Sequence, residues 1–213
     1  MQCPHCGAGH IIPTHGSINV SDNPSIKEKV RDGSLFLWEC PRCGGRNLAK
    51  YETLYHDPEL KLMFWLRPEE GFPLTEQVEK SMDKLAFTEG LETYALRRVS
   101  SVTDLIEKIN IAEAGLDDVT IEMCKLVLKM EMEEDSGQDF AEDIRDAKLI
   151  FSGMSGADND IMLSFPNRGQ IKTITIGFNV YEDCAGIIRR NPSLRPAPGF
   201  AVVDTQWLAG YFG

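Results

Sequence analysis

Apolar residues follow a helical period in the middle of the chain. Ser101 precedes a stripe with the i, i+3, i+4 and i+7 spacing of one helix face, and Gly115 closes that segment. Asp117-Asp118 opens a second helical segment with a broader apolar stripe, in which Cys124 is expected to be a small buried side chain. The two segments predict a helical hairpin, and residues 73–87 predict an amphipathic helix before it.

Shorter apolar runs before the hairpin have the length and alternation of β-strands. Residues 34–39 alternate two sets of apolar side chains, and residues 47–54 and 60–66 are predicted to be the partner strands. The turn between these partners falls at His56-Asp57-Pro58, where His56 is expected to be exposed. The segment 7–34 is expected to be a loop.

The last third of the chain predicts a small sheet followed by helices. Turns at 153–160 and 166–169 separate its apolar segments, which indicates an antiparallel meander. Asn179-Val180-Tyr181-Glu182 resembles a capping box and opens a helix expected to bury Cys184, and Thr205 is expected to cap a last short helix. The predicted strands are residues 147–151, 161–165 and 171–178.

Two closely spaced cysteine pairs give the chain its clearest chemical signal. They lie in Cys3-Pro4-His5-Cys6-Gly7 and Cys40-Pro41-Arg42-Cys43-Gly44, so both follow the pattern Cys-Pro-x-Cys-Gly. Two intervening residues let both sulfurs of a tight turn face one ion. Proline presets the φ angle of such a turn, and glycine tolerates the positive φ with which it often closes. We therefore predict one tetrahedral metal site, with the ligands Cys3, Cys6, Cys40 and Cys43.

Other chemistry uses similar cysteine pairs. Disulfides are disfavoured because no secretory signal precedes Cys3, which also favours a cytoplasmic location. A redox dithiol would have to follow a strand and begin a helix, whereas Cys3 stands at the start of the chain and Gly7-Ala8-Gly9-His10 follows the pair. Iron remains an alternative because thiolates also bind it, but zinc is favoured.

Four thiolates would fill the coordination shell of a zinc ion. Hydrolytic zinc sites normally keep one position for water, so this site is predicted to be structural. The nearby His5, His10 and His15 are expected to be ordinary loop or strand residues. No histidine follows His56, so the commonest general base is missing from most of the chain, which disfavours an enzyme.

The chain is acidic, and its charge is unevenly distributed. The formal net charge is −11 at pH 7; residues 1–72 contain 8 Lys and Arg against 9 Asp and Glu, and residues 73–213 contain 14 against 24. A nucleic-acid-binding protein needs a basic surface to neutralise phosphates, so a protein partner is favoured. The alternative is a nucleic-acid-binding zinc ribbon that uses Arg42, Arg46 and Lys50.

Length and hydropathy set the remaining limits. The 213 residues, of which 42% are hydrophobic, suffice for one large or two modest domains. No apolar run approaches the roughly 18 residues of a transmembrane helix, so no membrane association is expected. The acidic run 132–137 indicates a boundary between a domain of residues 1–135 and a C-terminal unit of residues 136–213.

Several segments resemble the CpXC family of bacterial and archaeal proteins, which is named for its cysteine motif. The resemblance covers about residues 1–135 and implies a presumed metal-binding domain with no established activity. The family's motif positions are Cys3, Cys6, Cys40 and Cys43. The segments that carry the resemblance are the two Cys-Pro-x-Cys pairs and residues 61–68, 97–99, 104–109 and 115–118.

Together, these features predict an α+β protein with an N-terminal zinc ribbon, a central helical hairpin and a C-terminal antiparallel sheet with helices. The favoured function is a structural zinc-binding module without enzymatic activity, which presents a surface to another protein or to a second copy of itself. The alternatives are the nucleic-acid-binding ribbon and an enzyme whose site lies in the C-terminal unit.

Overall fold

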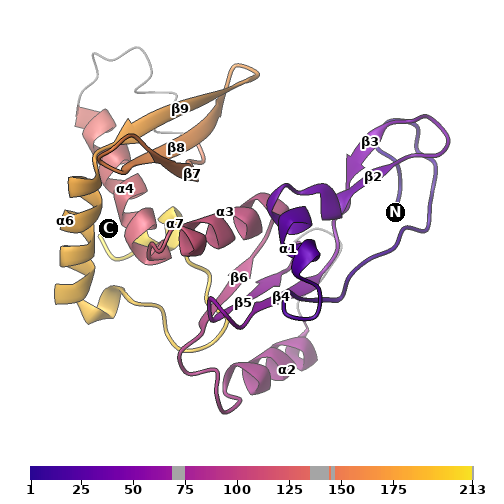
Figure 1. The fold of residues 1–213 in the computed structure, drawn as a ribbon, viewed down its shortest axis with the longest axis horizontal. Coiled ribbons are helices and arrows are strands. Elements are labelled where there is room, and N and C mark those ends of the chain that lie inside the picture. The colour runs from indigo at the N-terminus through magenta and orange to yellow at the C-terminus, as the bar shows by residue number, and fades with distance from the viewer. Residues whose placement is uncertain (69–74, 135–143, 145–146, 213) are drawn as a thin grey trace. The chain divides into compact units, whose positions relative to one another are not determined.

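The structure is a computed structural model in which most of the chain is described (Figure 1). The described residues are 1–68, 75–134, 144 and 147–212. Helices and strands both occur in these ranges, which confirms an α+β protein. No helix within them is long and apolar enough to cross a lipid bilayer. The predicted boundary between residues 135 and 136 lies outside the described residues.

The chain forms two units, and neither is one continuous segment. Unit 1 consists of Met1–Ile106 and Pro198–Ala201, and unit 2 consists of Glu107–Ala197 and Val202–Gly213. Helix α3 (Val102–Glu113) therefore starts in unit 1 and ends in unit 2.

Unit 1 is built on a mixed sheet of β1 (Ser17–Asn19), β4 (Thr53–Asp57), β5 (Leu62–Leu66) and β6 (Ala95–Val99), in the order β1-β4-β5-β6. β4 and β5 are antiparallel, whereas β1 runs parallel to β4 and β6 runs parallel to β5. Every residue of β5 is buried, as expected for an apolar strand that is covered on both faces.

Helix α2 (Glu76–Ala86) connects β5 to β6 and covers one face of this sheet (Figure 1). It confirms the helix predicted within residues 73–87. Ala86 packs in one apolar cluster with Met63 of β5, and Phe200 joins this cluster from the returning segment of unit 1.

The predicted pairing of the N-terminal strands is confirmed only in part. β2 (Leu37–Glu39) pairs with β3 (Arg46–Leu48) in a separate antiparallel hairpin, and the 3-10 turn η1 (Ser34–Phe36) replaces the first half of the predicted strand. The predicted strand 47–54 is divided between β3 and the start of β4. β4 pairs with β5, which lies within 60–66, as predicted, but these two strands belong to the separate four-stranded sheet. Their outer neighbours, β1 and β6, are distant in sequence, so local alternation gives no signal for this pairing.

Two further expectations for unit 1 are wrong. The segment 7–34 is not a single loop, because it contains β1 and the helix α1 (Pro24–Arg31), which starts at a proline suited to the first helical turn. His56 lies within β4 and not in an exposed turn. Its ring centroid lies 5.7 Å from that of Tyr94, and its Nε2 atom is buried without a hydrogen-bond partner in the described part of the chain.

Both helices predicted in the middle of the chain are confirmed. Ser101 caps α3 with its side chain, and Gly115 ends the segment at a φ of +71°. The second helix is α4 (Asp118–Glu134). Cys124 and Cys184 are both buried, as expected.

The prediction of a wide apolar face on these helices is incomplete. Glu107 and Lys108 of α3 are 3% and 4% exposed, and Glu122 and Lys125 of α4 are each 2% exposed. These four charged side chains form ion pairs with one another inside unit 2. Unit 2 therefore contains buried charge where the periodicity indicated only apolar side chains.

The predicted antiparallel meander is confirmed in unit 2 by β7 (Ile150–Ser155), β8 (Asp160–Asn167) and β9 (Gln170–Ile176). Its inward side chains pack with those of α3 and α4 in one core. The turn predicted at 153–160 is shorter than expected, because β7 continues past an irregularity near Gly153. Arg168-Gly169 has positive φ at both positions, as a tight two-residue hairpin turn requires.

Two predicted helix caps are wrong. Helix α6 (Phe178–Arg190) begins directly after Gly177, so Asn179 already lies in its first turn. Helix α7 (Thr205–Ala209) is capped by Asp204, whose carboxylate accepts a backbone N–H of the first turn. In both cases the chain enters the helix earlier than the capping pattern indicated. The 3-10 turn η2 (Pro192–Leu194) follows α6.

Candidate metal centre

The two cysteine pairs lie in turns with the same backbone hydrogen bonds. In each turn, the glycine after the second cysteine donates its N–H to the carbonyl of the first cysteine, at 2.9 Å for Gly7 and Cys3 and at 2.8 Å for Gly44 and Cys40. The first cysteine of each turn donates its own N–H to a carbonyl further along the chain, at 2.9 Å in both. Gly7 and Gly44 have φ values of +69° and +68°, where glycine is unstrained. The repeated sequence thus encodes the same turn twice.

The surrounding strands bring these two turns together. The second turn is the connection between β2 and β3, and the first is closed by an antiparallel bridge between Gln2 and Gly9. The Sγ atoms of Cys3 and Cys43 are 3.7 Å apart, and those of Cys6 and Cys40 are also 3.7 Å apart. All four sulfurs lie within 4.8 Å of one another.

These separations fit one four-coordinate ion. Metal–sulfur bonds of about 2.3 Å in a tetrahedral site would place the sulfurs about 3.8 Å apart. A disulfide bond would need sulfurs about 2 Å apart, and all four cysteines are free thiols. The four cysteines predicted from the sequence could therefore hold a metal ion together.

The neighbouring thiols act in opposite directions on the ionisation of Cys3 and of Cys6. Burial opposes ionisation of Cys3, but N–H groups of Cys6 and His5 and the neighbouring thiols lower the pKa of Cys3 to about 6. The Ala8 N–H favours the Cys6 thiolate, but burial and the other sulfurs together raise the pKa of Cys6 to about 12. A thiolate at Cys3 thus opposes ionisation of the Cys6 thiol. A divalent cation between the sulfurs would remove this repulsion between thiolates.

Two polar side chains that the sequence prediction missed surround the sulfurs. Asn47 on β3 is 6% exposed; its Nδ2 donates to Gly45 O at 2.7 Å and lies 3.8 Å from the Sγ of Cys3. His10 was expected to be an ordinary loop or strand residue, but its Nε2 lies 3.2 Å from the Sγ of Cys40. N–H donors around a metal–thiolate site orient its ligands. Their only sequence signal was their closeness to the cysteine pairs.

The Gly45 position leaves no room for a side chain. A Cβ atom there would lie 2.6 Å from Cδ2 of His5 and 3.3 Å from the Sγ of Cys43. We expect Gly45→Ala to displace His5 and weaken Zn²⁺ binding roughly tenfold, in line with the cost of about 1–3 kcal/mol for overpacking. Competition with a chromophoric zinc chelator measures this change. Gly9→Ala is the matched control because a Cβ there meets no atom within 4 Å, and equal affinities of the two variants would contradict the prediction.

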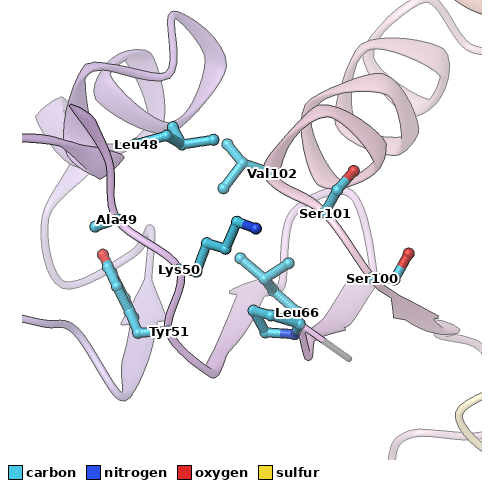
Figure 2. Close-up of a pocket in the computed structure, with 9 residues that line it drawn as sticks. Leu48, Ala49, Lys50, Tyr51, Leu66, Ser100, Ser101 and Val102 are labelled. Atoms are coloured by element: carbon cyan, nitrogen blue, oxygen red, sulfur yellow. The ribbon is translucent and has the colours of Figure 1, made fainter. Parts of the chain in front are cut away.

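A shallow hollow of about 230 Å³ lies elsewhere in unit 1, and we call it the Leu48 hollow. Figure 2 shows Leu48 and Val102 pointing toward one another across it, with Lys50 beside them. Among the described residues that line it there is no carboxylate or histidine. Its lining residues are Leu48, Ala49, Lys50, Tyr51, Leu66, Pro68, Ser100, Ser101 and Val102. This lining offers apolar contact and not a set of convergent catalytic groups.

The chain belongs to the CpXC family. The family model described as CpXC protein matches residues 1–125, which is more than half of the chain and includes all four cysteines of the cluster. No curated protein and no solved structure matches the chain. The family and the four-cysteine cluster are compatible with a metal-binding module.

Proposed function

We propose that this protein is a non-enzymatic module organised by one structural zinc ion, and that it acts by contacting another protein. The observation that carries the proposal is the placement of four sulfurs at the separations of a tetrahedral site. Zinc is favoured because closed sites with four cysteine ligands are typical of structural zinc, although the same soft ligands bind iron.

The ion is proposed to stabilise the structure and not to take part in a reaction. Four thiolate ligands leave no coordination position for water or substrate, so the ion would not act as a Lewis acid. It would instead tie the first cysteine turn to the β2–β3 hairpin, as in a zinc ribbon. This hairpin has only three residues in each strand, and such a small sheet is marginally stable without a cross-link.

The proposed contact surface is the outer face of the same hairpin. Leu37 and Leu48 lie directly opposite each other on β2 and β3 and are 51% and 47% exposed. Leu48 also lines the Leu48 hollow, so the apolar surface continues beyond the hairpin. An exposed apolar patch favours a protein partner, and the net charge of −11 disfavours nucleic acid.

Two measurements test the two halves of this proposal. Elemental analysis of the full-length protein should find one zinc per chain. Iron in its place would contradict the choice of metal. Absence of any bound metal would contradict the proposal that a metal ion organises the module. Cross-linking in cells tests whether the outer face of the β2–β3 hairpin contacts another protein.

We expect Leu37→Ser combined with Leu48→Ser to lose cross-links to a partner protein while keeping the full metal content. Phe87→Ser, at a residue that is 72% exposed after α2, is the control and should keep the cross-links. Unchanged cross-links in the double variant, or cross-links only to a second copy of the chain, would contradict the proposed surface.

A further inference from the structure

Five charged side chains form one connected network between α3 and α4 in unit 2. Lys125 Nζ lies 2.7 Å from Glu107 Oε1 and 2.9 Å from Glu122 Oε1. Lys108 Nζ lies 3.1 Å from the same oxygen of Glu122 and 3.2 Å from Asp118 Oδ2. Two ammonium groups therefore face three carboxyl groups. If all five were ionised, one negative charge in excess would be enclosed at a site with little access to solvent.

The three carboxyl groups are not equally compensated. Glu122 contacts both ammonium groups, and its Oε2 accepts a hydrogen bond from the Thr205 hydroxyl at 2.8 Å. The Asp118 side chain contacts one ammonium group but keeps 12% of its surface exposed to water. The Glu107 side chain contacts one ammonium group and the N–H of Phe151, and it is only 4% exposed. Glu107 is thus the carboxyl group for which a negative charge is least stabilised.

We propose that Glu107 holds a proton in the folded protein at pH values where surface carboxyl groups are ionised, and that this proton makes the stability of unit 2 sensitive to pH. Its Oε1 atom accepts hydrogen bonds from Lys125 Nζ and, at 2.5 Å, from the N–H of Phe151 on β7. We therefore place the proton on Oε2 of Glu107. When Glu107 is protonated, the network contains two ammonium groups and two carboxylates.

The electrostatic surroundings agree with this assignment. Burial raises the pKa of Glu107 against the opposing effect of Lys125. Burial also acts on Glu122, but Lys108 and Lys125 hold the pKa of Glu122 below its ordinary value. Burial lowers the pKa values of both lysines, but the surrounding carboxylates outweigh this effect and raise them, so these lysines stay charged while Glu107 titrates.

The sign of the pH dependence follows from the proton count. The folded protein keeps a proton on Glu107 that the unfolded chain has lost, so the folded state binds more protons above the ordinary pKa of a glutamate. Stability therefore falls as the pH rises from that value through the raised pKa of folded Glu107. Release of the proton leaves a buried carboxylate that Lys125 and the Phe151 N–H compensate only in part, and the folded state bears the free-energy cost of burying that charge.

Carboxyl ¹³C NMR of the full-length protein, labelled at glutamate, tests the protonation directly. We expect one glutamate signal to stay in the protonated position after the surface glutamates have ionised, and to be absent from Glu107→Gln. A spectrum in which every glutamate titrates at or below the ordinary pKa would overturn the proposal, and this result needs no variant to fold.

A pair of matched substitutions tests the effect on stability. Trp207 lies in unit 2, so 5-fluorotryptophan labelling and ¹⁹F NMR during urea unfolding report this unit separately. The ratio of the folding constant of the wild type to that of Glu107→Gln should fall as the pH rises, by up to tenfold per pH unit, the limit for one proton.

Glu182→Gln is the control, because Glu182 is exposed on α6 of the same unit and lies outside the network. The folding constants of the wild type and of this variant should stay close to each other across the same pH range. A ratio for Glu107→Gln that is constant or rises with pH would overturn the proposal.

Discussion

Cys40→Ser should abolish tight metal binding and unfold the β2–β3 hairpin. Cys40 is fully buried, and its sulfur lies 3.7 Å from that of Cys6 and 3.2 Å from Nε2 of His10. A serine hydroxyl stays protonated at neutral pH and is a poor ligand for a soft metal site. Structural zinc sites contribute about 10–16 kcal/mol of apparent binding free energy at pH 7, and this free energy is linked to folding. The zinc content measured by elemental analysis should therefore fall from one zinc per chain to a small fraction of that value.

The location of the structural change distinguishes this result from general unfolding. Amide hydrogen exchange should show loss of protection in the two cysteine turns and in β2–β3. The four-stranded sheet has its own apolar cluster and should keep most of its protection. Cys184→Ala is the control, because Cys184 is also buried but lies on α6 in unit 2. A full metal content in a chain that lacks both Cys40 and Cys43 would refute the site.

Lys125→Met should destabilise unit 2 by about 3–5 kcal/mol, the range observed when one partner of a buried ion pair is removed. Lys125 is 2% exposed and bridges Glu107 and Glu122 at 2.7 and 2.9 Å. Methionine keeps the side chain as far as Cε, so the loss comes mainly from the missing ammonium group and not from a large cavity. Urea unfolding followed through Trp207 by ¹⁹F NMR measures the change in unit 2.

The same substitution at the surface shows what burial contributes. Lys80 pairs with Glu76 at 2.5 Å on α2, but the two side chains are 68% and 79% exposed. We expect Lys80→Met to cost about 0.5 kcal/mol or less, because water screens an exposed pair. Similar costs for the two variants would mean that the network in unit 2 adds no more to stability than a surface pair.

Features that depend on neighbouring residues could be predicted from the sequence. Ser101 caps a helix and Gly115 ends one because each acts on backbone groups within a few residues of itself. The meander of unit 2 could also be predicted, because its strands are joined by short turns and are adjacent in both sequence and space. The caps of α6 and α7 were misplaced by only one or two residues, since several nearby residues can occupy a cap position.

Features that depend on distant residues could not be predicted in this way. The pairing of β5 with β6 joins segments separated by α2, and the pairing of β1 with β4 joins segments separated by α1 and the β2–β3 hairpin. The burial of Lys125 could not be predicted, because a sequence pattern does not record which partners will surround a charge. His10 was undervalued for the same reason, since its contact with Cys40 spans 30 positions.

The sequence by itself determined the two cysteine turns, because proline, glycine and the spacing of the sulfurs act within five consecutive residues. The tertiary structure is needed to bring the four sulfurs within 4.8 Å of one another, since this requires the N-terminal turn to lie against the β2–β3 hairpin. Only the tertiary structure placed Glu107, Glu122 and Lys125 together inside unit 2. The physical reason is the same in both cases: the energy of a charge or a thiolate depends on the groups that folding brings within a few ångströms.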